Sequence, residues 1–197
     1  MNMRFISAPA ALLLLPLAAG CGGNGADVPA MVSATACAAD RACVSTVAGS
    51  GEPGDSDGQA LAARFRYPHA LAVDADGSLQ VADYGGSGSV RTIGADGWVA
   101  TVSGNSIAMP TPSDVAVDAD GNRYVADPYN NRILKQTPDG RSLTLAGQGA
   151  NAGGDLDGDA STARFSLPTG VVLDAAGGVL YVADMGNAKV RRIVLAR

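Results

Sequence analysis

Two aspartate-rich stretches are the first candidates for chemistry in this chain of 197 residues. Residues 54–65 have the sequence GDSDGQALAARF, and residues 154–165 have the sequence GDLDGDASTARF. Most of the segment therefore recurs 100 residues later. Carboxylate oxygens are ligands that Ca²⁺ prefers. The candidate calcium ligands are Asp55, Asp57, Asp155, Asp157 and Asp159.

The spacing of these aspartates departs from that of an EF-hand. Such a loop needs glycine at its sixth position and a bidentate glutamate at its twelfth. Counting Asp55 as the first position, Gly58 is the fourth and Arg66 is the twelfth. The alternative is a compact connector in which small and aromatic residues pack, Arg64 pairs with a carboxylate, and Pro68 ends the segment before the next strand.

His69 is the single histidine of the chain and follows a proline. A histidine in this place is a candidate ligand or base, or a hydrogen-bonded residue that only fills space. Tyr67, Met109 and Tyr129 are candidates for an apolar lip nearby.

The composition indicates short strands joined by tight turns. The chain has 26 glycines, and its 19 acidic residues are 18 aspartates and Glu52. Aspartate suits turns because its short side chain bonds to nearby backbone. The formal net charge of −5 argues against nucleic acid as a partner, since phosphate binding needs clustered Lys and Arg.

The first twenty residues are typical of a secretory signal, with Arg4 followed by an apolar run. Residues 17–21, LAAGC, resemble a bacterial lipobox, which predicts lipidation of Cys21 and an outer-membrane or periplasmic place in the cell envelope. Plain secretion is the alternative. In the linker 21–43, Cys37 and Cys43 are predicted to form a disulfide, as a close pair in an exported protein suggests.

Three segments repeat: 71–85, 115–129 and 171–186. Each has an apolar strand, a turn led by aspartate and containing glycine, and a second strand that ends in Val-Ala-Asp, which is the pattern of a β-hairpin. A third strand follows each hairpin, and a fourth follows the first two. Four antiparallel strands in about 45 residues predict an all-β fold of β-propeller blades.

The middle copy, VAVDADGNRYVADPYNNRILK, resembles the NHL repeat of β-propellers. The two aspartate-rich stretches are similar to the connector that many bacterial NHL proteins carry between blades. The resemblance covers residues 44–197 and implies three blades, at about 70–103, 114–147 and 170–195. Residues 44–49, VSTVAG, match the fourth-strand phrases and are expected to complete the last blade of the same chain.

Three blades do not close a ring, because propellers have four to eight. An open arc exposes two apolar blade faces. Two chains would give six blades, a size that the NHL family often uses, so a homodimer is expected. A fragment of a longer propeller is the alternative.

Antiparallel strands alternate in direction, so every second connection emerges on the same face of the propeller. The connectors and the loops after each Val-Ala-Asp are therefore expected on one face. Loops on a rigid scaffold often carry binding function. The candidate binding residues on this face are Arg64, His69, Asp83, Asp127, Tyr129, Asn130, Arg164, Asp184 and Asn187. The alternative for the aspartates is that each holds its own turn, because they recur in every blade.

Two classes of function follow. The favoured class is an exported, membrane-anchored binding or scaffold propeller for a protein, peptide or glycan, with no cofactor and no catalytic residue assigned. The alternative is a lactonase-like hydrolase or lyase with a metal in the central channel of a dimer. Such a metal needs convergent His, Glu, Asp or Asn ligands, and each chain has one histidine and one glutamate.

Overall fold

The computed structural model describes residues 42, 44–85, 89–102 and 111–196. The predicted signal, Cys21, Cys37, Cys43 and Met109 lie outside these residues, so what the sequence predicts for them stays a prediction. Within the described residues, no helix has the length and apolar character needed to cross a membrane.

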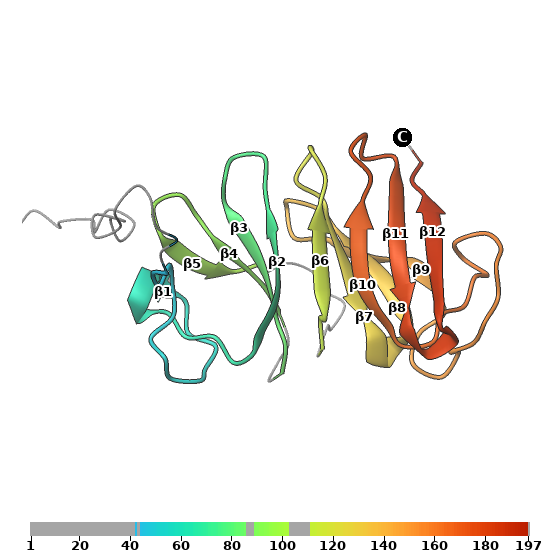
Figure 1. Cartoon of the computed structure of the whole chain (residues 1–197), viewed down its shortest axis with the longest axis horizontal. Helices are drawn as coiled ribbons and strands as arrows, with labels where there is room; N and C mark the ends of the chain where they lie inside the picture. The colour runs from blue at the N-terminus through green and yellow to red at the C-terminus, as the bar shows by residue number, and fades with distance from the viewer. Residues whose placement is uncertain (1–41, 43, 86–88, 103–110, 197) are drawn as a thin grey trace, which may run out of the picture.

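The described chain folds into three antiparallel sheets, set side by side as propeller blades (Figure 1). The first blade comprises β2 (Pro68–Val73), β3 (Leu79–Asp83), β4 (Ser89–Ile93) and β5 (Trp98–Thr101), with the short β1 (Gly58–Gln59) paired to β5. The second blade comprises β6 (Asp114–Val117), β7 (Arg123–Asp127), β8 (Arg132–Gln136) and β9 (Ser142–Gly147). The third blade comprises β10 (Pro168–Leu173), β11 (Val179–Asp184) and β12 (Lys189–Val194). The all-β prediction of three blades, forming a partial propeller, is confirmed.

Hairpin turns at 74–78, 118–122 and 174–178 join the first two strands of each blade. The inner strands β2, β6 and β10 lie next to one another. One-turn 3₁₀ helices occupy the first connector and the loops after β7 and β11: η1 (Ala60–Ala62), η2 (Pro128–Asn130) and η3 (Met185–Asn187). In the turn of the middle hairpin, Asp118 accepts hydrogen bonds from the backbone N–H groups of Asp120 and Asn122. Gly121 there has a φ of +76°, a conformation that glycine adopts without strain. The Asp-Gly turns therefore act as hairpin turns, as the pattern predicted.

Alternating residues of each strand form the two interfaces between blades. Residues of the first blade, Ala82 and Val90, pack against Val115, Val125 and Leu134 of the second. The other face of the second blade packs against the third through Tyr124, Ile133, Phe165, Leu180 and Val182. Two layers of the core therefore lie between blades. A third cluster packs the first blade against its connector through Ala63, Val81, Ile93 and Val99.

The expected closing strand is not where the sequence predicted it. Residues 44–49 form no strand, and β12 pairs only with β11 within the described residues. Instead, the backbone N–H groups of Gly49 and Ser50 donate to the carbonyl oxygens of Ala60 and Ala63, next to the first blade. The physical reason is distance: the first and third blades form opposite ends of the arc, so this segment cannot reach β12 of its own chain (Figure 1).

Candidate functional site

Each aspartate-rich connector is fastened by an arginine from the blade that follows it. In the first blade, Arg91 of β4 is fully buried and donates to Asp57 Oδ1 (2.7 Å) and to the carbonyl oxygen of Arg64 (2.9 Å). Its guanidinium also lies over the ring of Phe65, 5.1 Å from the ring centroid. The connector is thus held by charge, hydrogen bonds and an aromatic ring together.

The second connector repeats this arrangement on the third blade. Arg191 of β12 donates through Nε to Asp157 Oδ1 (2.9 Å) and through Nη1 to the carbonyl oxygen of Arg164 (3.1 Å). Its guanidinium lies 5.2 Å from the ring centroid of Phe165. At the equivalent position of β8 in the second blade stands Leu134, which is packed in the core between the first two blades.

Four of the five candidate calcium ligands, all except Asp159, are partners of basic residues. Asp55 accepts from Arg66 (2.8 Å), and Asp155 accepts from Lys189 (2.5 Å). Burial alone would raise the pKa of Asp57, but hydrogen bonds from Thr101 and Arg91 bring that pKa below its ordinary value. The carbonyl oxygen of Asp159 accepts from the N–H groups that follow it. Among the described residues, no group of three or more His, Cys, Asp or Glu side chains is placed to hold a metal ion.

Within the part of the chain that the structure describes, Arg64 forms no ion pair with a carboxylate, contrary to the expectation. Arg64 supplies its carbonyl oxygen to Arg91, and its side chain passes Gly54 so closely that a Cβ there would lie 3.0 Å from it. Arg164 does the same for Arg191, beside Gly154. Both predicted binding arginines thus belong to their connectors.

The three Val-Ala-Asp aspartates are buried and hold their own loops. Asp83 accepts from the backbone N–H groups of Arg66 and Tyr67. The other two accept from side chains and backbone of nearby residues: Asp127 from Asn130 and Arg132, and Asp184 from Ser166, Asn187 and Arg191. The carboxylates are engaged inside the fold, so Asp83, Asp127, Asp184, Asn130 and Asn187 position loops.

A cluster on the predicted face combines aromatic rings with the histidine, and we call Tyr67, His69, Tyr84 and Tyr129 the aromatic rim. The rings of Tyr67 and Tyr84 meet edge to face, with their centroids 6.5 Å apart. The centroid of the His69 ring lies 6.2 Å from that of Tyr84. Tyr84 donates a hydrogen bond to the hydroxyl of Tyr129 (3.5 Å), which raises the pKa of Tyr84. Tyr67 is 62% exposed and Tyr129 is 61% exposed.

The rim spans two blades because the inner strands begin side by side. His69 Nδ1 donates to the carbonyl oxygen of Ser113 (2.7 Å), and Ser113 Oγ donates to the carbonyl oxygen of Thr169 (3.0 Å). These three residues occupy equivalent positions at the start of the three inner strands. The hydrogen bond fixes the imidazole of His69 while the side chain stays exposed.

Asp114 breaks the repeat beside the rim. Its positional equivalents in the first and third blades are Ala70 and Gly170. Burial raises the pKa of Asp114, against the opposing effect of hydrogen bonds from the N–H groups of Val171 and Val115. Carboxylates with a raised pKa are common at functional sites.

Sequence reasoning named His69, Tyr67 and Tyr129 but gave Tyr84 no role beyond its loop. Tyr84 follows the Val-Ala-Asp of the first blade, where the other blades have Pro128 and Met185. This break of the repeat was the available signal. It becomes meaningful only when the fold brings the loops of two blades together.

No protein-family model matches the chain. The chain is similar to Teneurin-m of Drosophila melanogaster, with 30% identity over 180 residues, covering 75% of this chain and 6% of that protein. It is also similar to NHL repeat-containing protein 2 of Gallus gallus, with 41% identity over 85 residues, covering 43% of this chain and 11% of that protein. The chain thus spans a small part of the length of these curated relatives.

Among solved structures, the fold is similar to an auxiliary nutrient binding protein from Bacteroides thetaiotaomicron VPI-5482. The TM-score is 0.54 at 21% identity, and the match covers 62% of this chain and 36% of that one. An auxiliary nutrient binding protein from Bacteroides ovatus ATCC 8483 has a TM-score of 0.50 at 21% identity. These likenesses concern the fold.

Proposed function

We propose that this chain, which belongs to the NHL-repeat β-propeller proteins, is an exported binding module whose aromatic rim takes a protein or peptide ligand. The observation that carries the proposal is the rim itself. Among the described residues of the predicted face, it joins exposed tyrosines with a fixed imidazole, while the carboxylates nearby are engaged inside the fold.

The residue types of the rim favour a polypeptide. Tyrosine is enriched at protein interfaces because its ring offers a large contact area and its hydroxyl a hydrogen bond, at the entropic cost of few rotatable bonds. The hydroxyls of Tyr84 and Tyr129 and the imidazole of His69 provide donors and acceptors for backbone groups of an extended segment. A glycan is the second ligand class to test.

A selection of displayed random peptides on the purified chain tests the proposal. We expect selected peptides to bind the double variant Tyr67→Ala/Tyr129→Ala about 10- to 30-fold more weakly, the loss typical of an interface hot spot. Trp98→Ala is the matched control, because Trp98 is also exposed, at 50%, but lies on the outer strand β5.

The outcomes separate the ligand classes. Peptides that bind the double variant as tightly as the natural chain would refute the rim as their site. Binding to a glycan array that is lost in the double variant, with no peptide selected, would keep the rim and replace the ligand class.

The proposed location rests on the N-terminal residues. The apolar leader 1–20 and the lipobox-like LAAGC support export and a lipid anchor on Cys21. We expect Cys21→Ala to move the chain from the membrane fraction to the soluble fraction and to abolish labelling with a radioactive fatty acid. Retention of the label in this variant would refute the anchor.

The hydrolase or lyase alternative requires a channel metal. Metal analysis of the purified chain, before and after dialysis against a chelator, tests it directly. A stoichiometric metal that survives purification would favour the enzyme over the binding module. His69 Nδ1 bonds to the carbonyl oxygen of Ser113, so a metal at this residue would have to bind Nε2.

A further inference from the structure

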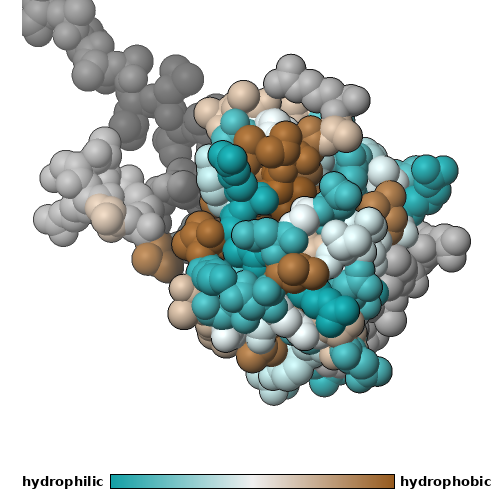
Figure 2. All heavy atoms as spheres, turned by 90° about the vertical axis from the view of Figure 1, so that its right-hand side faces the viewer, coloured by the Kyte–Doolittle hydropathy of each residue, from teal (hydrophilic) through white to brown (hydrophobic). Residues whose placement is uncertain are grey.

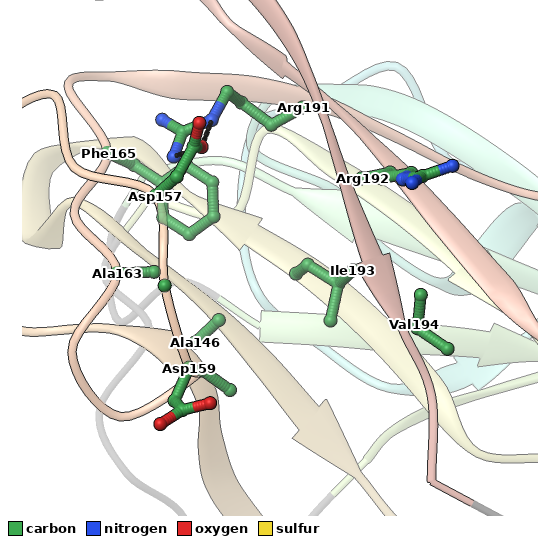
Figure 3. Close-up of a pocket in the computed structure, with 11 residues that line it drawn as sticks. Ala146, Asp157, Asp159, Ala163, Phe165, Arg191, Arg192, Ile193 and Val194 are labelled. Carbon is green, nitrogen blue, oxygen red and sulfur yellow. Dashed lines mark hydrogen bonds and ion pairs between the residues drawn. The ribbon is translucent and has the colours of Figure 1, made fainter.

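Within the described residues, no strand pairs with the outer edge of β12, and a cavity lies beside this edge. A hollow of about 310 Å³ separates β12 from the second connector. Figure 3 shows Arg192, Ile193 and Val194 of β12 on one side of the hollow, and Asp157 and Asp159 of the connector on the other. An unpaired strand edge presents free N–H and C=O groups, which is a template for another strand.

The first blade shows what belongs in such a space. There, β5 lies between β4 and the connector strand β1, with Val99 opposite Gly58. Gly158 is the equivalent of Gly58 and has nearly the same φ, +152° against +154°. The hollow in the third blade therefore lies where β5 lies in the first blade. Its two sides, β12 and the second connector, are the equivalents of β4 and β1, between which β5 is paired.

Residues 44–49 have the sequence and exit geometry of a fourth strand. VSTVAG aligns with SLTLAG of β9, which is the fourth strand of the second blade. Gly49 and Gly147 have φ values of +105° and +94°, and the next glycines in the two phrases, Gly51 and Gly149, have +85° and +96°. Each chain segment then enters a connector of the same design.

Residues 44–49 nevertheless pair with none of the described strands of their own chain. Val44 is 99% exposed and Val47 is 44% exposed, and the described segment belongs to none of the three sheets. It leads into the first blade, as β9 leads into the third. Its place in a closed ring is therefore the blade that precedes the first one.

The two outer faces of the arc match each other. Val190 on the third blade is 78% exposed, whereas its equivalent in the second blade, Ile133, is fully buried against the third. Leu71 on the first blade is 63% exposed, whereas its equivalent in the third blade, Val171, is 7% exposed. The outer faces of the third and first blades are therefore equivalent to the two surfaces that pack together between the second and third blades.

Figure 2 views the end of the molecule formed by the third blade and shows apolar surface between polar side chains. The exposed apolar residues on this outer face are Val172, Tyr181, Val190 and Val194. An apolar sheet face of this kind marks an interaction site. In the second blade, the equivalent face is covered by the third blade. The covering face of the third blade is in turn the equivalent of the first-blade face that carries Leu71 and Val73.

We infer that two copies of this chain close a six-bladed ring by exchanging their N-terminal strands. Residues 44–49 of each copy fill the hollow beside β12 of the other, and each third blade packs on the first blade of the partner. The register follows from β8 and β9: Gly49 lies opposite Lys189 of the partner subunit, and Ser45 lies opposite Arg192 of the partner subunit. Donation of a strand to an open edge is an established mode of association.

The inference is independent of the ligand proposed for the aromatic rim. It does have a consequence for the rim, because closure sets the loops of a third blade beside Tyr67 of the other copy. The ring would carry two rims, each bordered by both chains. Failure of ligand binding would leave the ring intact, and failure of the ring would leave the rim exposed on a monomer.

Cross-linking tests the strand exchange. Two full chains are prepared in which the three native cysteines are replaced by serine, one carrying Ser45→Cys and the other Arg192→Cys. Directly opposed residues in antiparallel strands are close enough for a disulfide. We expect a disulfide-linked dimer after the two chains are mixed and oxidised, and no linked species from either chain alone.

Lys135→Cys in place of Arg192→Cys is the matched control. Lys135 is the equivalent residue of the second blade, where Leu143 already occupies the opposite position. This control should give no dimer. A chain carrying both Ser45→Cys and Arg192→Cys that links only within itself would overturn the inference, and so would a mixture that forms no link.

Light scattering with variants of the outer faces gives a second test. The natural chain should have twice the mass of one chain, and Val190→Asp or Leu71→Asp should each yield a monomer. Leu143→Asp, which changes an exposed leucine on the second blade, should stay dimeric. A monomeric natural chain would overturn the inference.

Discussion

At the scale of single residues, Asp57 links pH to the stability of the first connector. Because its folded pKa lies below the ordinary 3.8, ionisation of Asp57 contributes stability above that value, and this stability is lost as pH falls through the folded pKa. We expect Asp57→Asn to lower the urea midpoint at pH 7, with a loss that shrinks as pH falls well below 3.8. An equal loss at pH 7 and at pH 2.5 would contradict the assignment.

Asp114 should behave in the opposite way, since burial raises its pKa. Above the raised folded pKa, the ionised carboxylate disfavours folding, and below 3.8 the effect vanishes. We expect Asp114→Asn to raise the urea midpoint at pH 7 and to leave it nearly unchanged at pH 3. A destabilised variant at pH 7 would instead show that the two accepted backbone hydrogen bonds outweigh burial of the charge.

Residue spacing alone gave an incomplete account of these aspartates. It correctly placed them in connectors, but it proposed a carboxylate partner only for a neighbouring arginine, Arg64. Their partners Arg91 and Arg191 come from strands about 34 residues away and meet them only after the blade has folded. The sequence did hold one clue: these arginines interrupt apolar strands in the two blades that follow an aspartate-rich connector, and Leu134 stands in the blade that does not.

At the scale of elements, each connector should loosen when its own arginine is removed. Arg91→Leu copies the residue of the second blade and leaves Asp83 with one partner fewer inside the fold. Removing one member of a buried ion pair costs about 3–5 kcal/mol. We expect trypsin to cleave faster after Arg64, whose carbonyl oxygen Arg91 holds, as measured by mass spectrometry of a timed digest.

The second connector supplies the control for this digest. Arg191→Leu should speed cleavage after Arg164 and leave the rate after Arg64 unchanged, because Arg191 holds only the second connector. Faster cleavage at both sites in either variant would mean that the blades unfold together and that the arginines do not act locally.

At the scale of the whole molecule, the repeat predicted three blades and an arc that does not close, and the structure has both. The similarity of residues 44–49 to the fourth strands predicted that they complete the last blade of the same chain. The similarity of VSTVAG to other fourth strands does not distinguish pairing within one chain from pairing with a second copy. Only the positions of the first and third blades, at opposite ends of the arc, exclude the first choice (Figure 1).

Closure by two chains would couple stability to concentration. When unfolding also separates the subunits, each tenfold rise in protein concentration favours the dimer by about 1.4 kcal/mol. For a dimer with two domains of this size, that corresponds to a rise in Tm of roughly 2 °C per tenfold. We expect this slope in calorimetry of the natural chain and of Leu143→Asp, and a Tm independent of concentration for Val190→Asp. The same slope in Val190→Asp would show that the subunits associate through a surface other than the outer faces of the arc.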